Sequence, residues 1–108
     1  MKNNVLKEIE GRLTKYFLDV IVMHELRTSN HLSGYDVMEL VNTKFGILIS
    51  PGTIYSLLYS LERKGLIEGS INNEKRTYVL TDKGRKTTNT IEGSKEEIQI
   101  FVQTLLEA

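Results

Sequence analysis

Apolar residues recur at helical spacing in the first part of the chain, from Val5 to Leu26. Between Tyr16 and Met23 they occupy both sides of the predicted helix, and a helix that is apolar all round is buried on more than one side. The second side therefore faces either the centre of the monomer or a partner chain. Gly11 is the position at which we expect this helix to bend or break.

A second, short helix is predicted after a polar turn over residues 27–32. Ser33 can cap it, and Asp36 stands at the third position, near the positive end of the helix dipole. The apolar stripe ends at Phe45, and Gly46 follows as a stop signal. The apolar residues 47–49 come next and are candidates for a short strand.

A third helix is predicted over residues 51–64. Ser50 can cap it, and Pro51 suits the first helical position. At 100° per residue, one face is apolar: Ile54, Leu57, Leu58 and Leu61. The opposite face is polar and able to form hydrogen bonds: Gly52, Ser56, Tyr59, Ser60 and Arg63. The helix should therefore pack on one side and leave the other side accessible.

Two runs rich in β-branched and aromatic residues follow Gly65, at residues 66–71 and 76–80, joined by the polar residues 72–75. They predict a β-hairpin. A capped helix followed by a hairpin is the order of parts in a winged helix-turn-helix, in which the helix enters the major groove of DNA and the hairpin lies along the backbone. The alternative is that the polar helix face is only a solvated surface.

The last part of the chain predicts a helix from Asp82 to about Leu106, capped by Thr81. Ile91, Ile98 and Leu105 recur every seven residues, as in the seam of a coiled coil. Ser94 and Phe101 occupy the intermediate heptad positions, and Ser94 with its neighbour Gly93 weakens the seam. The seam predicts a dimer unless this helix folds back on the first one. The expected interface comprises Leu13, Phe17, Val20, Ile91, Ile98, Phe101, Val102 and Leu105.

The expected fold class is thus mainly α with a small β-hairpin. Residues 1–81 form a winged-helix DNA-binding domain, and residues 82–108 form a C-terminal dimerisation helix. A chain of 108 residues is long enough for one such domain.

Composition narrows the function further. Cysteine is absent and there are only two histidines, so we expect neither a metal site nor a cofactor. No signal peptide or membrane span is visible, which predicts a cytoplasmic protein that does not bind membranes. Formal net charge is zero, but it sums to 0 over residues 1–61, +3 over 62–86 and −3 over 87–108. The positive charge lies on the predicted hairpin and its flanks, a bias too small to predict DNA binding by itself.

Several motifs resemble the PadR-like family of winged-helix transcriptional regulators. They are Gly34-Tyr35, residues 50–55 (SPGTIY), Leu61-Glu62, Gly65-Leu66-Ile67, Arg76, Tyr78, Leu80-Thr81 and Gly84. The matches run from Ser33 to Gly84, about half of the chain. Ser33, Ser56 and a wing tip without glycine depart from the family's pattern, and the last departure puts the wing contacts in doubt.

The resemblance implies a homodimer, usually a repressor, that is sometimes released from DNA by a small effector. Because such a dimer has two-fold symmetry, we expect its operator in double-stranded DNA to be palindromic. The expected DNA contacts are Tyr35, Ser50, Gly52, Thr53, Tyr55, Ser56, Tyr59, Ser60, Arg63, Lys64, Lys75 and Arg76. Lys75 and Arg76, with Lys64 and Lys83 as further candidates, should meet phosphates, although Arg76 is equally placed to pair with Glu68 across the hairpin. A candidate effector pocket between the two chains is lined by Tyr16, Phe17, Val20 and Phe101.

A second function class stays open, namely a winged-helix module that binds another protein through a patch containing Tyr55 and Tyr59. Zero net charge favours this alternative slightly. An enzymatic function has almost no support, because no phosphate-binding loop, carboxylate pair or Ser-His-Asp set is visible.

Overall fold

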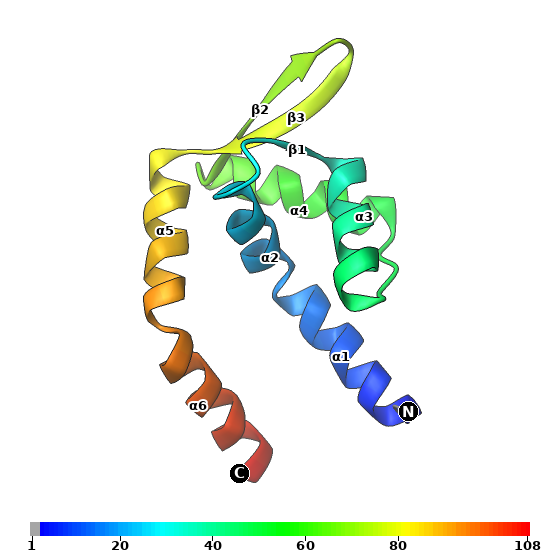
Figure 1. Ribbon diagram of the computed structural model, residues 1–108, viewed down its shortest axis with the longest axis vertical. Coiled ribbons are helices and arrows are strands. Elements are labelled where there is room, and N and C mark those ends of the chain that lie inside the picture. The colour runs from blue at the N-terminus through cyan, green and yellow to red at the C-terminus, as the bar shows by residue number, and fades with distance from the viewer. Residues whose placement is uncertain (1–2) are drawn as a thin grey trace.

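The computed structural model describes residues 3–108. A helical body carries a β-hairpin at one end, and the first and last helices extend from the body at the other end, where both chain termini lie (Figure 1). The described part measures 47 × 29 × 21 Å along its principal axes. This elongated shape separates the hairpin from the two terminal helices.

The first predicted helix is in fact two helices, α1 (Asn4–Tyr16) and α2 (Leu18–Leu26). The break lies at Phe17, where φ and ψ are −99° and 16°, and the expectation of a break at Gly11 is therefore wrong. The two helices differ in their surroundings, since α2 buries Leu18, Val22, Met23 and Leu26 in the body. The break allows α1 to leave the body while α2 stays at its centre.

Helix α3 (Gly34–Phe45) begins and ends as the sequence predicts. The Ser33 hydroxyl accepts a hydrogen bond from the Asp36 N–H (3.1 Å), and an Asp36 carboxylate oxygen accepts one from the Ser33 N–H (2.8 Å). These two bonds form a capping box. Gly46 ends the helix in the left-handed conformation, with φ of 66°.

The sheet contains a strand that the sequence did not predict. Strand β2 (Ile67–Asn72) and strand β3 (Lys75–Leu80) form the hairpin, with Asn73 and Glu74 at its tip. Within residues 3–108 the sheet has the order β1-β3-β2, where β1 (Leu32–Ser33) pairs with β3 through Leu32 opposite Tyr78. The candidate strand at residues 47–49 is wrong, because that segment is a loop.

That loop contributes to the core instead. Ile49 is buried, while Leu48 next to it is 82% exposed. The loop leads into α4 (Pro51–Arg63), which packs against α2, α3 and β2. The core thus lies between α2, α3, α4 and the base of the hairpin, and its buried hydrophobic residues are Leu18, Val22, Met23, Leu26, Val37, Val41, Ile49, Ile54, Leu58, Leu61, Ile67, Tyr78 and Leu80.

The last predicted helix is also two helices, α5 (Asp82–Gly93) and α6 (Lys95–Glu107). The break lies at Ser94, whose hydroxyl bonds to the Thr90 carbonyl oxygen (2.9 Å) and whose φ and ψ are −102° and 12°. A continuous helix to Leu106 is therefore wrong. α5 packs against α2, whereas α6 extends beyond the body next to α5 (Figure 1).

Candidate nucleic-acid interface

The two faces of α4 are separated as predicted. Ile54, Leu58 and Leu61 are at most 2% exposed, and Leu57 is half-buried. On the opposite face Ser56 and Arg63 are exposed, Tyr59 is 62% exposed and Ser60 is half-buried. The packed face fixes the helix to the body, so the polar face is presented to solvent in one orientation.

The first turn of α4 is held by its cap. The Ser50 hydroxyl accepts a hydrogen bond from the Thr53 N–H (3.2 Å) and lies 2.9 Å from the Thr53 hydroxyl. Both residues are exposed, as are Pro51 and Gly52. The positive end of the helix dipole is therefore accessible to an anion such as a phosphate.

Two tyrosines lie near this end of α4: Tyr55 connects α4 to α3, and Tyr35 belongs to α3 itself. The Tyr55 ring lies against Gly34, where an added Cβ would come within 2.5 Å of it. Gly34 thus permits the close approach of the two helices. The Tyr35 hydroxyl donates a hydrogen bond to a Glu39 carboxylate oxygen (3.0 Å), and this bond raises the pKa of Tyr35 above its ordinary value. Tyr55 and Tyr35 remain 51% and 58% exposed, respectively.

Two predicted phosphate contacts have partners inside the chain. The Arg76 guanidinium contacts the Glu62 carboxylate at 2.8 Å, and this carboxylate raises the pKa of Arg76. The expected alternative partner, Glu68, is wrong, because Glu68 lies opposite Val79 in the sheet. Lys83 donates a hydrogen bond to the carbonyl oxygen of Lys64 (2.8 Å), at the end of α4.

The other predicted cations of this surface are exposed as well. Arg63 lies over the Tyr59 ring, 5.6 Å from its centroid, so that both side chains belong to one surface. Lys64 and Lys75 are exposed. The hydrogen bond from the Ser33 N–H lowers the pKa of Asp36, and the positive charge of Lys75 lowers it further. The candidate interface therefore combines the polar face of α4, the first turn of α3 and the hairpin.

Sequence reasoning did not identify Glu62 and Gly69 as functional residues. Glu62 accepts hydrogen bonds from Arg76 and from the Gly69 N–H. An isolated glycine within a predicted strand indicates a close approach by another group, and this signal was present at Gly69. Nothing in the local sequence indicated which group would approach.

A groove with a volume of about 340 Å³ lies at the opposite end of the body, between α2 on one side and α5 and α6 on the other. It is lined by Phe17, Val20, His24, Ile91, Glu92, Lys95, Ile98 and Gln99. Two residues of the candidate effector pocket, Phe17 and Val20, are therefore here. The other two, Tyr16 and Phe101, do not line this groove within one chain. Their side chains are 84% and 63% exposed, respectively.

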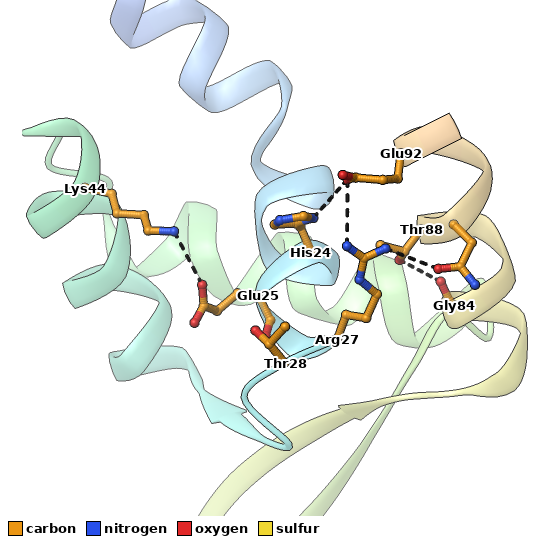
Figure 2. Close-up of polar contacts among 9 residues, drawn as sticks. His24, Glu25, Arg27, Thr28, Lys44, Gly84, Thr88 and Glu92 are labelled. Carbon is orange, nitrogen blue, oxygen red and sulfur yellow. Dashed lines mark hydrogen bonds and ion pairs between the residues drawn. The ribbon is translucent and has the colours of Figure 1, made fainter. Parts of the chain in front are cut away.

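Polar contacts hold α2 against α5 beside this groove (Figure 2). Glu92 lies 3.5 Å from His24 Nδ1 and 3.8 Å from the Arg27 guanidinium, which also bonds to Asn89 (3.2 Å). On the other side of α2, Lys44 pairs with Glu25 at 3.7 Å. Within residues 3–108 no group of three His, Asp or Glu side chains is placed to hold a metal ion, and no helix in the same range could cross a membrane.

The fold and this interface define a winged helix-turn-helix protein. The chain belongs to the transcriptional regulator PadR-like family, whose model matches residues 22–90. Members of this family are regulators of transcription. The match includes α3, α4, the hairpin and most of α5.

Solved structures show the same fold. A PadR family transcriptional regulator from Eggerthella lenta is 25% identical, with a TM-score of 0.77 over 97% of this chain and 95% of its own. A PadR-like regulator from Bacillus cereus is 24% identical, with a TM-score of 0.71 over 90% and 98%. F93 from STIV, described as a winged-helix DNA-binding protein, is 22% identical, with a TM-score of 0.63 over 77% and 88%. No curated protein sequence matches the chain significantly.

Proposed function

We propose that this chain is a sequence-specific DNA-binding regulator of transcription, acting as a homodimeric repressor. In this proposal α4 enters the major groove and the hairpin lies along the DNA backbone. The observation that carries it is the polar face of α4, where Ser56, Tyr59 and Arg63 are exposed while Ile54 and Leu58 hold the opposite face in the core. The first residues of such a helix are those nearest to base edges.

The proposal of a dimer is supported by apolar residues that stay exposed in a single chain. Residues 1–81 are proposed to be the DNA-binding domain and residues 82–108 the dimerisation region. Leu13 of α1 is 44% exposed, and Phe101 and Leu105 of α6 are 63% and 61% exposed. Large apolar patches on a single chain indicate an interaction surface. A two-fold dimer would present two copies of α4 to half-sites about 34–36 Å apart, and the operator should be palindromic.

The groove between α2 and the helices α5 and α6 is proposed as the effector site of this dimer. Phe17, Val20 and Ile98 give it an apolar lining, and a second chain would add cover from α6. A ligand there could alter the distance between the two copies of α4, and hence the preferred spacing of half-sites.

Selection of binding sites from random DNA duplexes tests the function. We expect enriched palindromic sequences with the full chain, and no enrichment with a Ser56→Ala/Tyr59→Ala/Arg63→Ala variant whose thermal unfolding is unchanged. A Thr43→Ala variant provides the matched control, because Thr43 is exposed near the end of α3, outside both the proposed DNA interface and the proposed dimerisation region. Failure of the full chain to enrich any sequence would exclude sequence-specific binding.

The second candidate function is a protein-binding module, favoured by the exposed rings of Tyr55 and Tyr59 together with zero net charge. Salt separates the two functions. DNA binding through phosphates weakens steeply as salt rises, whereas an apolar protein contact does not. A tight, salt-independent complex with a protein and no enriched duplex would favour the module.

A further inference from the structure

One carboxylate at the end of α4 holds both strands of the hairpin. The Glu62 oxygens accept hydrogen bonds from the Arg76 guanidinium of β3 at 3.0 and 2.8 Å. One of the same oxygens accepts a hydrogen bond from the backbone N–H of Gly69 in β2 (3.1 Å). Glu62 therefore connects the proposed recognition helix directly to the wing, through a side chain on one strand and the backbone of the other.

The path of the Arg76 side chain depends on Gly69. A Cβ at Gly69 would lie 2.7 Å from Arg76 Nη2 and 2.9 Å from Cζ, so the guanidinium occupies the space that any other residue would fill. The ring of Tyr78, which stands opposite Gly69 in the sheet, lies 5.5 Å from the guanidinium carbon. Arg76 is thus positioned by the Gly69 backbone, the Tyr78 ring and the Glu62 carboxylate together.

Only one of the two wing strands, β3, pairs with a further strand of the sheet. Strand β1 pairs with β3 through Leu32 and Ser33, which lie opposite Tyr78 and Thr77. Beyond Gly69 and Thr77 the hairpin residues are exposed, and a two-stranded hairpin is marginally stable alone. Ile67 anchors the base of β2 in the core, and Glu62 adds a polar contact between α4 and β2 farther along the strand, at Gly69.

The wing carries few charged residues, and their charges cancel. Residues 67–80 contain Glu68, Glu74, Lys75 and Arg76 and have no net charge. Arg76 is already paired with Glu62, whose side chain is 29% exposed, while that of Arg76 is 45% exposed. Lys75 is the only other lysine or arginine in this range, and it is the cation that the wing can offer to a phosphate.

We propose that Glu62 is a positioning residue that fixes the wing relative to α4, and that Arg76 serves as its partner rather than as a phosphate ligand. This inference rests on the proposed DNA-binding function. The wing then reaches DNA in a preset orientation, which lowers the ordering cost of binding. Its electrostatic contribution comes from Lys75.

The proposal makes an unusual prediction for Glu62→Gln. If Arg76 were a phosphate ligand, this change would release it and remove a negative charge near DNA, so binding would tighten. If Glu62 positions the wing, the same change weakens binding by about tenfold. Arg76→Ala should weaken binding by a similar factor, and the double variant should be no weaker than either single variant, because both changes break one connection.

The test measures the dissociation constant for a selected operator duplex as a function of salt. We expect Glu62→Gln, Arg76→Ala and Gly69→Ala to weaken binding with an unchanged slope of log K against log salt. Lys75→Ala is the matched control and should flatten that slope by about 0.9 per contact. Tighter binding by Glu62→Gln, or a slope flattened by about 0.9 in Arg76→Ala, would overturn the proposal.

Hydrogen exchange of the Gly69 amide provides a readout in the free protein. We expect faster exchange in Glu62→Gln and Arg76→Ala at unchanged global stability, because the acceptor of that N–H is weakened or displaced. Unchanged exchange would show that Glu62 does not hold the wing. If the wild-type chain bound no duplex at all, the proposed function would fail, and the exchange data would still establish whether the connection exists.

Discussion

Helices α4 and α6 have the same length, 13 residues, and both are amphipathic, yet they differ in what covers their apolar side chains. α4 buries Ile54, Leu58 and Leu61 within its own chain. α6, every residue of which the structure describes, buries none. The difference arises because α4 is surrounded by α2, α3 and β2, whereas the main neighbour of α6 is α5. The same pattern therefore builds a core in one case and leaves a free apolar face in the other.

The free faces of the two helices differ in kind. The outward side of α4 carries hydroxyl groups and a guanidinium, which can form hydrogen bonds with DNA bases. α6 instead exposes the apolar side chains of Ile100, Phe101, Leu105 and Leu106, each more than 60% exposed. Covering such a side chain contributes roughly 1.5–3 kcal/mol. This difference supports the proposal that the polar face of α4 binds DNA and that the apolar side chains of α6 pack against a second chain.

Removing α6 should produce the largest effect. A chain truncated before Ser94 loses Ile98, Phe101, Val102 and Leu105, and we expect its dimer dissociation constant to rise by more than about 1000-fold. Sedimentation in solution measures this directly. A truncated chain that stays dimeric at micromolar concentration would show that α6 is not the principal interface, and the comparison of the two helices would lose its functional meaning.

Replacing a leucine by alanine should affect the free energy of unfolding differently in the two helices. Leu58→Ala creates a cavity in the monomer core and should lower the free energy of unfolding by about 2–5 kcal/mol at any protein concentration. Leu105→Ala should reduce stability only under conditions in which the wild-type chain is dimeric. Urea unfolding at several protein concentrations distinguishes the two. A concentration-independent loss for Leu105→Ala would mean that α6 packs within its own chain.

The polar face of α4 should affect binding but not folding. Replacing Ser56, Tyr59 or Arg63 by alanine should each weaken DNA binding by roughly 1–3 kcal/mol wherever the side chain contacts a base. Titration of a selected duplex measures the effect, and thermal unfolding should be unchanged because these side chains are exposed. Wild-type affinity in all three variants would place the DNA contact elsewhere.

The elements that the sequence predicted well are those with local signals at their ends. Ser33 and Gly46 bound α3, and Ser50 caps α4, each through contacts within a few residues along the chain. The faces of α4 followed from helical spacing in the same way. Local chemistry and periodicity therefore fixed most of the winged-helix body and the exposed side of its proposed recognition helix.

The features that the sequence did not predict depend on distant partners. Phe17 has no helix-breaking chemistry, and the break there follows from the burial of α2 next to it. Strand β1 has only two residues and forms because β3 offers an edge. Glu62 and Arg76 are 14 residues apart, so their pairing depends on how the hairpin packs against α4. Helical or strand periodicity contains no information on such contacts.

Removing a helix cap should produce the smallest change in the free energy of unfolding. The caps also distinguish α6 from the helices of the body, because α3 has a capping box while α6 has no side-chain cap. Ser33→Ala should lower the free energy of unfolding by about 1 kcal/mol.

The hydrogen bond from the Ser33 N–H lowers the pKa of Asp36, so the unfolded chain binds the proton more tightly than the folded chain. The contribution of the Asp36 charge is complete above the ordinary carboxyl pKa of about 3.9 and is lost as pH falls through the lower, folded value. Asp36→Asn should therefore be less stable than wild type at pH 7, and this difference should shrink below about pH 4. Chemical denaturation at both pH values measures it, with Thr43→Ala, an exposed position on the same helix, as a control. A difference that grew on acidification would contradict the role of the charged cap.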